Sequence, residues 1–311
     1  MQQEQRSAGF LQRGWIVGGL AIFCNLLWGS AFPGIKVGYS LLHVASYDTV
    51  AQILFAGSRF FLAGIMVILV GSLMQRKFLH PKKDEVGTVV QISLVQTVLQ
   101  YLFFYVGLAH TTAVKGSVLV ATNVFFCIML TGFVFKTEQV SRQKLLGCLI
   151  GFAGVVLINL GGGGVSLSIN VFGDICIVLT ALSSAFSSVL LKKYGQNVNP
   201  VMLSGYQFMW GGAFMAVVGL IFGGRLENVS FAGAGILLYL AFLSAAAYTI
   251  WSILLKYNPV SKVTIFGFFN PVFGVILSTL ILREGGSFGI QGMLALLLVC
   301  IGIIIVNLEK K

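Results

Sequence analysis

Charged residues are scarce in this chain. Only 9% of its 311 residues are Asp, Glu, Lys or Arg, whereas 57% are apolar, and the mean hydropathy is +0.95. A soluble domain carries about 25% charged and roughly 45–50% apolar residues, so this composition cannot provide a water-facing surface for a folded chain. The sequence therefore excludes a soluble enzyme and predicts a membrane protein.

Acidic residues are scarcer than basic ones. The chain has 9 Asp and Glu against 20 Lys and Arg, which gives a formal net charge of +11. In a soluble protein this excess would indicate binding to nucleic acid, but in a membrane protein it marks the side of the bilayer on which the loops lie. We therefore expect a lipid bilayer, and no nucleic acid, among the partners.

The cysteines give no sign of a disulfide or a metal site. All five lie within apolar runs, and no two of them form a CxxC pair. This pattern predicts neither a disulfide framework nor a zinc site, so we expect no metal and no cofactor. The five residues are Cys24, Cys127, Cys148, Cys176 and Cys300.

Long apolar runs are abundant. A membrane-spanning helix needs about 20 mostly apolar residues, and ten such runs lie between polar breaks of this sequence. The first run is too long for the core of a signal peptide, and the loops are too short for a separate domain. The sequence thus predicts an all-α membrane protein with ten transmembrane helices. The predicted spans cover about residues 15–39, 50–73, 87–108, 114–135, 143–160, 171–191, 200–223, 232–255, 262–282 and 287–308.

The basic residues predict the orientation of these spans. If the amino terminus is cytoplasmic, 15 of the 20 Lys and Arg fall in cytoplasmic segments and three in outer segments, while Lys36 and Arg59 lie within spans. Cytoplasmic loops of membrane proteins carry such an excess of Lys and Arg. We therefore predict a multi-pass protein of the cell membrane with both termini in the cytoplasm.

The two halves of the chain share a pattern. Residues 105–138 align without gaps with residues 251–284: an aromatic residue closes one span, an Asn lies near the middle of the next, and a Glu ends it. Because the repeating unit has five spans, an odd number, the two copies must cross the membrane in opposite directions. The sequence thus predicts two inverted five-helix repeats, an organisation typical of secondary transporters. The predicted parts are a cytoplasmic tail (1–14), repeat 1 (15–160), a Gly-rich linker (161–170), repeat 2 (171–308) and a second cytoplasmic tail (309–311).

Five short motifs follow one another along the spans. They are Trp28-Gly29-Ser30-Ala31-Phe32 in the first span, Arg59-Phe60 in the second, Glu138 at the end of the fourth, Asn270-Pro271 in the ninth, and Glu284 at the end of the ninth. In this order they resemble the ten-span EamA-type branch of the drug/metabolite transporter superfamily, over about residues 15–308. The first repeat departs from the pattern, since Phe125 stands where the second has Pro271. The resemblance implies transport, often export, of a small metabolite that it does not specify.

No acidic residue falls in the middle of a predicted span. All nine lie at a terminus, in a loop or at the end of a span. A proton-coupled exporter of cations generally relies on a buried carboxylate that exchanges a proton for its cargo. The sequence therefore favours facilitated diffusion, although His110 or Asp174 could still carry a proton.

Polar and aromatic side chains near the centres of the spans are the candidate substrate-binding residues. An amide buried in lipid is costly without a partner, so these side chains should face other helices or a wet cavity. The competing interpretation is that they only join helices by hydrogen bonds, each worth roughly 0.6 kcal/mol. The candidates are Asn25, Trp28, Gln96, Gln100, Tyr101, Asn123, Ser184, Tyr248 and Asn270.

Two aromatic and two basic residues are further candidates. Tyr105 and Trp251 are counterparts in the two repeats and lie on opposite sides of the membrane centre, so they are either gates or members of interfacial belts. Arg59 either binds an anionic group of the substrate or is a structural ion paired with Asp48. Lys36 lies near the outer end of its span, where a lysine can extend its ammonium group to the interface.

Glycine and proline positions predict packing and hinges. Gly147 and Gly151 lie one helical turn apart, a spacing that permits close helix contact, more plausibly within the monomer than in a dimer. Pro33-Gly34 and Pro271 remove or weaken helix hydrogen bonds beside the predicted cavity. We expect them to act as hinges.

The leading hypothesis is a transporter that moves an amino acid or a related amphipathic, zwitterionic solute by alternating access, as a monomer or homodimer. The first alternative is a proton-coupled exporter of drugs or cationic metabolites, and the second is a membrane receptor or structural protein without transport. An intramembrane enzyme is disfavoured, because the chain has no HExxH or GxGD motif and only three histidines, all in loops.

Overall fold

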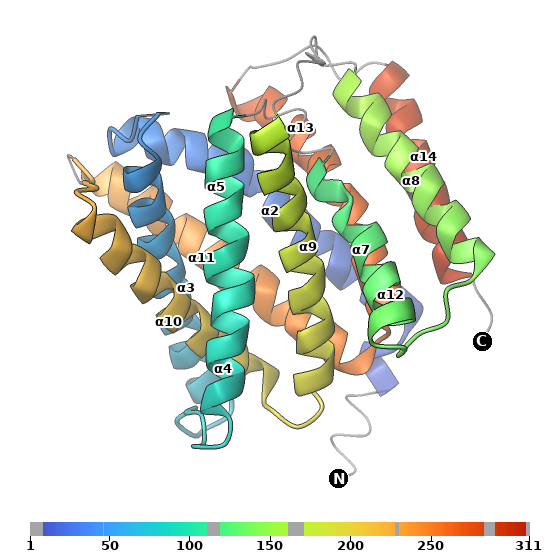
Figure 1. Cartoon of the computed structure of the whole chain (residues 1–311), viewed down its shortest axis with the longest axis horizontal. Coiled ribbons are helices and arrows are strands. Elements are labelled where there is room, and N and C mark those ends of the chain that lie inside the picture. Colours follow the sequence, from blue (N-terminus) through green and yellow to red (C-terminus); the bar gives the residue numbers. More distant parts are fainter. Residues whose placement is uncertain are drawn as a thin grey trace.

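The computed structural model describes residues 9–45, 47–110, 119–160, 171–227, 230–282 and 290–308. Throughout these ranges every regular element is a helix, and the helices stand side by side in one bundle (Figure 1). They are α2 (Gly14–Leu41), α3 (Thr49–Met74), α4 (Val86–Ile92), α5 (Gln100–His110), α7 (Asn123–Met129), α8 (Arg142–Leu160), α9 (Val171–Tyr194), α10 (Pro200–Ile221), α11 (Phe231–Tyr257), α12 (Val260–Thr264), α13 (Phe269–Leu282) and α14 (Ile290–Asn307), with π-helical η1 (Ser93–Leu99) and η2 (Leu130–Val134) and the 3-10 helix η3 (Ile265–Phe268) between some of them.

The prediction of a multi-pass membrane protein is confirmed, whereas the count of ten spans is not. Each predicted range overlaps a helix. Within the described residues, however, only seven helices are long and apolar enough to cross a membrane, and the apolar helices Leu119–Val134 and Gly292–Asn307 are shorter. Helix α8 carries Arg142 and Lys144 in its first turn and is not among the seven.

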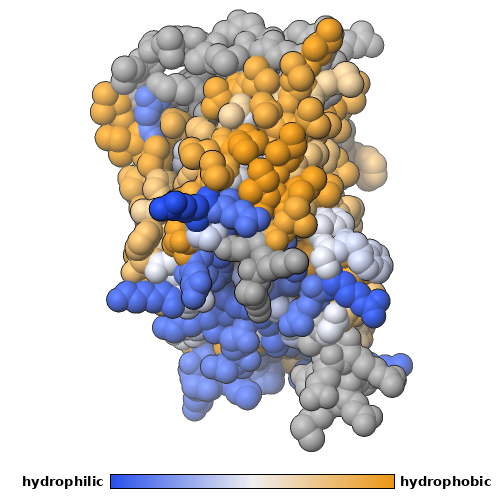
Figure 2. All heavy atoms as spheres, turned by 90° about the vertical axis from the view of Figure 1, so that its right-hand side faces the viewer, coloured by the Kyte–Doolittle hydropathy of each residue, from blue (hydrophilic) through white to orange (hydrophobic). Residues whose placement is uncertain are grey.

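Some predictions fall outside the described residues. These are the linker 161–170, the ends of both tails (1–8 and 309–311), and the motif residue Glu284. The described loops 75–85 and 195–199 lie at the same end of the bundle (Figure 1). Figure 2 shows hydrophilic residues gathered over the lower part of one face and hydrophobic residues above them. This division is typical of a protein whose charged end projects from a bilayer.

Two helix pairs approach through glycine. Helix α3 packs along α10, and α8 packs along α14 (Figure 1). A Cβ atom added at Gly57 would lie only 2.3 Å from the backbone nitrogen of Ala216. One added at Gly147 would lie 2.7 Å from the carbonyl oxygen of Gly302. The prediction that Gly147 serves contact within the monomer is therefore confirmed, and backbones this close gain extensive van der Waals contact.

The other main contacts also join a helix from the first half of the chain to a helix from the second half. Helix α2 packs against α11 and α13, and helix α9 packs against α5 and α7. Helix α11 also contacts α3, while η1 contacts α10. The interior of the bundle is thus formed by helices from residues 9–160 interleaved with helices from residues 171–308.

The two prolines differ in their effect. Helix α2 continues through Pro33 without interruption. Pro271 is the third residue of α13, which directly follows the 3-10 helix η3. A proline at 271 cannot donate to the carbonyl of Gly267, which lies in η3, so the irregular segment lies where Pro271 predicts it. The π-helical η1 and η2 were not predicted, and such segments are frequent at functional sites.

Candidate functional site

A chain of aromatic rings runs through the bundle. The ring centroids of Tyr105 and Tyr101 are 6.4 Å apart, and the hydroxyl groups of Tyr101 and Tyr248 are hydrogen-bonded at 2.7 Å. The Trp28 ring lies 5.0 Å from that of Tyr248 and 5.0 Å from that of Trp251, both edge-on. The two aromatic residues proposed as gates are therefore connected by three rings from α5, α11 and α2.

Two phenylalanines complete this cluster. Phe60 stacks on Phe208 with a centroid separation of 5.2 Å and lies 4.4 Å from the Tyr101 ring. Phe208 meets Tyr248 edge-on at 5.0 Å. Phe208 could not be predicted as a member of this cluster, because it is one of 26 phenylalanines in the chain and only its neighbours in the structure distinguish it.

Arg59 lies beside the aromatic cluster. Its side chain is 3% exposed, and its guanidinium carbon lies 4.5 Å from the Phe60 ring centroid and 5.9 Å from that of Tyr101. Its Nε and Nη1 atoms are buried without a hydrogen-bond partner. The alternative of an ion pair with Asp48 does not hold, because Asp48 caps α3 by accepting from the Ala51 amide, about 16 Å along the helix from Arg59.

Four of the predicted amide side chains have an oxygen atom without a hydrogen-bond partner. The Oδ1 atoms of Asn25 and Asn270 and the Oε1 atoms of Gln96 and Gln100 are buried without a partner. The indole Nε1 of Trp28 is likewise unpartnered. Buried polar groups are nearly always hydrogen-bonded in folded proteins, so these five groups are candidate contacts for a polar ligand or water.

Two other predicted residues satisfy each other. Asn123 donates from Nδ2 to the Ser184 hydroxyl at 2.9 Å and thereby joins α7 to α9. Gln207 accepts from the Thr97 hydroxyl at 2.7 Å and joins α10 to η1, while its own Nε2 has no partner among the described residues. These bonds fit the helix-joining interpretation. The unpartnered groups fit the ligand-binding one.

Lys36 lies apart from this cluster. It is exposed on α2, five residues before the helix ends at Leu41. That position fits a lysine that extends toward the interface, and it places no charge near the aromatic chain.

A second polar cluster lies at the end of the bundle that carries the basic loops. The Glu138 carboxylate accepts from the backbone N–H of Val260 at 2.5 Å and from the N–H and hydroxyl of Ser261, and it forms an ion pair with Lys144 at 3.5 Å. Anionic groups are favoured at a helix N-terminus, and Val260 begins α12. The cluster thus joins the loop before α8 to the start of α12.

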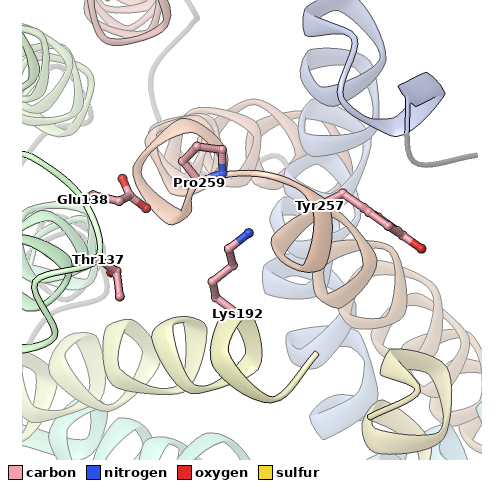
Figure 3. A pocket seen from close by; sticks show the side chains of 5 residues that line it. All are labelled: Thr137, Glu138, Lys192, Tyr257 and Pro259. Carbon is pink, nitrogen blue, oxygen red and sulfur yellow. The ribbon is translucent and has the colours of Figure 1, made fainter. Parts of the chain in front are cut away.

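A cavity of about 240 Å³ opens beside Glu138 (Figure 3). Its lining comes from three segments, and the Lys192 ammonium group projects into the space between Glu138 and Tyr257. Lys192 donates to the carbonyl oxygen of Lys256 at 3.2 Å. The lining residues are Thr137, Glu138, Lys192, Tyr257 and Pro259.

Among the described residues, no group of three or more His, Cys, Asp and Glu could hold a metal ion. The described cysteines are free thiols, four of them buried and Cys300 partly buried. Of the charged side chains that the structure describes, the buried one is that of Arg59.

Comparison with known proteins connects this architecture to transport. A model described as the EamA-like transporter family matches residues 15–160 and 171–308. The chain is 25% identical over 287 residues to the "Uncharacterized transporter YoaV" of Bacillus subtilis (strain 168), an alignment that covers 91% of this chain and 93% of that protein. It is 28% identical over 260 residues to the "Uncharacterized inner membrane transporter YedA" of Escherichia coli (strain K12), covering 82% and 79%. One crystal structure superposes with a TM-score of 0.74 at 17% identity, over 94% of this chain and 98% of that one, so it has the same fold.

Proposed function

The chain belongs to the EamA-like transporter family, and from this premise we propose that it exports an amino acid or a related zwitterionic metabolite across the cell membrane. As a member of that family it is a membrane transporter and not an enzyme. The remaining questions are where the solute binds and how the path opens to one side at a time.

One observation supports an amino acid or a related zwitterion as the solute. Unpartnered donors and acceptors lie in the bundle together with a continuous chain of aromatic rings. A ligand with both an apolar and a polar part suits this lining, because rings hold apolar surface and ammonium groups while amides orient the polar ends. The proposed binding residues are Asn25, Trp28, Gln96, Gln100, Tyr101, Tyr248 and Asn270, with Asn123 and Ser184 supporting them.

Two inverted repeats are proposed as the basis of alternating access. In this scheme α2, α3, α5, α7 and α8 correspond to α9, α10, α11, α13 and α14. The helix contacts support it, because exchanging counterparts converts the α2–α11 contact into α9–α5 and the α2–α13 contact into α9–α7. The pairs α3–α10 and α8–α14 join counterparts directly. Rocking of one repeat against the other would then expose the site to each side in turn.

The proposed gates lie at the two ends of the ring chain. Tyr105 closes the outer end and Trp251 the inner end, and both side chains are buried. The Glu138 cluster reinforces the inner closure, because it joins residues 9–160 to residues 171–308 by a charged contact. This scheme assigns the basic end of the bundle, and both termini, to the cytoplasm, in keeping with the excess of Lys and Arg there.

Efflux from proteoliposomes tests the function. Vesicles that contain the purified protein are loaded with labelled L-leucine or L-phenylalanine, and loss of label is compared with protein-free vesicles, with and without a pH gradient. We expect efflux that needs no gradient. Efflux of cationic drugs alone, driven by a gradient, would support the proton-coupled alternative, and absence of any flux or binding would contradict the proposal.

A further inference from the structure

Arg59 is a buried cation that forms no ion pair with any described residue. It lies ten residues into α3, about 15 Å from the start of that helix, and only 3% of it is exposed. An arginine near a helix end can extend its guanidinium to the interface. Arg59 is too deep and too enclosed for that solution.

The surrounding side chains compensate only part of the desolvation. Removing an ion from water is costly even after relaxation, and a desolvated cation–π contact offsets only part of that cost. Arg59 has one close contact of this kind, with Phe60, and a longer one with Tyr101. No carboxylate of the described residues forms an ion pair with it, since the ion pair found among them is Lys144–Glu138. A protein keeps such a group where a ligand supplies the missing anion.

The unpartnered amides of the bundle offer acceptors for a cationic group of that ligand. Ser187 donates its hydroxyl hydrogen to the Ser184 carbonyl, so its oxygen must accept from the Nε2 group of Gln96. The unpartnered atom of Gln96 is therefore its oxygen, an acceptor. Asn25 is fixed in the same way, because only its Nδ2 group can donate to the Ala21 carbonyl.

Arg59 offers hydrogen-bond donors in a planar fork that matches a carboxylate. The unpartnered oxygens of Gln96 and Asn25, elsewhere in the bundle, are acceptors that suit an ammonium group. We propose that Arg59 is the anion-binding group of the transport site and that it holds the solute through a carboxylate. This assignment rests on the proposed function, because it concerns the same site.

Binding of matched ligands tests the assignment. Competition with tritiated L-leucine on the purified full-length protein compares L-leucine with L-leucinamide, which lacks the anion, and with 4-methylpentanoate, which lacks the ammonium. We expect at least about 30-fold weaker binding of the amide, and the same loss for L-leucine on Arg59→Gln, since removing one partner of a buried charge pair has effects of this size. Arg59→Lys should recover part of the affinity, and Arg225→Gln, a change at an exposed loop arginine, should have none of these effects.

A thermal-shift measurement without ligand separates binding from structure. If only a bound ligand pairs with the charge of Arg59, then Arg59→Met removes an unpaired charge from the ligand-free protein. This change should raise the melting temperature by about 2–4 °C. A lower melting temperature would make Arg59 a structural ion and overturn the proposal. The role of Arg59 would also be overturned if L-leucine and L-leucinamide bound equally well and Arg59→Gln changed neither affinity. That result would not contradict the proposal that the protein transports amino acids. If the wild-type protein binds neither compound, nor L-phenylalanine, the proposed function fails instead, and the thermal shift still decides the role of Arg59.

Discussion

The carboxylate of Glu138 accepts a hydrogen bond from the backbone N–H of Val260, 122 positions further along the chain, at 2.5 Å. The contact is charge-assisted and lies at the N-terminus of α12, where the helix dipole strengthens it. Lys144 balances the charge from the other side. One side chain thus holds together the two halves that alternating access would have to separate.

Removing this carboxylate should open the end of the bundle at which Glu138 lies. Hydrogen bonds to charged groups are worth about 1.5–3 kcal/mol, so Glu138→Ala should increase the open population by about 10-fold or more. The readout is the rate at which a hydrophilic maleimide labels Val263→Cys, a buried position just behind the contact. The four fully buried native thiols should contribute little background. Asp84→Ala, at an exposed loop acid of the same end, should leave the rate unchanged, and an equal rate in Glu138→Ala would speak against a closing contact.

Asn123 and Gln100 should respond differently to truncation. Asn123→Ala breaks the bond to Ser184, and we expect a loss of about 1 kcal/mol, seen as a melting temperature lower by about 2–4 °C. Gln100→Ala removes an oxygen that has no protein partner, so it should change the melting temperature less and weaken solute binding more. The same binding loss for both variants would show that the paired and unpaired amides do not differ in role.

Trp28 should matter for both stability and binding. It contacts Tyr248 and Trp251 edge-on, and each such ring pair is worth about 0.5–1.5 kcal/mol beyond the buried area. Trp28→Leu should therefore lower the melting temperature and slow efflux of L-phenylalanine. Trp15→Leu is the matched control, because Trp15 is largely exposed. Normal efflux in Trp28→Leu would remove this residue from the proposed path.

Gly57 should tolerate no side chain. The nearest atom to an added Cβ is a backbone nitrogen of α10 at 2.3 Å, which cannot move aside as a side chain can, so Gly57→Ala must push α3 away from α10. Overpacking of this kind costs typically 1–3 kcal/mol, measured as a lower melting temperature. Gly87→Ala is the control: nothing lies within 4 Å of its added Cβ in α4, and a gain of up to about 1 kcal/mol is expected there. Equal behaviour of the two variants would contradict the close approach of α3 and α10.

Much of the helix organisation was predictable from the sequence, because burial in lipid requires uninterrupted apolar helices. The predicted range 50–73 and the observed α3 (Thr49–Met74) differ by a residue at each end. The irregular helices were not predictable in this way. Ser93–Leu99 is as apolar as an α-helical segment, and its π-helical bonding depends on how η1 packs between α9 and α10.

The residues of the candidate site could be predicted from the sequence, but their hydrogen-bond partners could not. Depth along each span was enough to select Gln96, Gln100 and Asn123 as intramembrane amides. Which of these amides has a hydrogen-bond partner depends on which helices meet in the fold. Asn123 pairs with Ser184, for example, although the two residues are far apart in the chain. The pairing of Arg59 with Asp48 was plausible from their shared helix, and it fails because the three turns between them exceed the reach of both side chains.

By itself the sequence determined that this chain is an all-helical membrane protein of the EamA-like transporter family, because hydropathy and motif order are properties of the chain alone. The tertiary structure decided which polar atoms remain unpartnered, since hydrogen bonding depends on which helices meet. It thereby separated Arg59 and the amide oxygens, which have no partner among the described residues, from Asn123 and Ser184, which are hydrogen-bonded to each other.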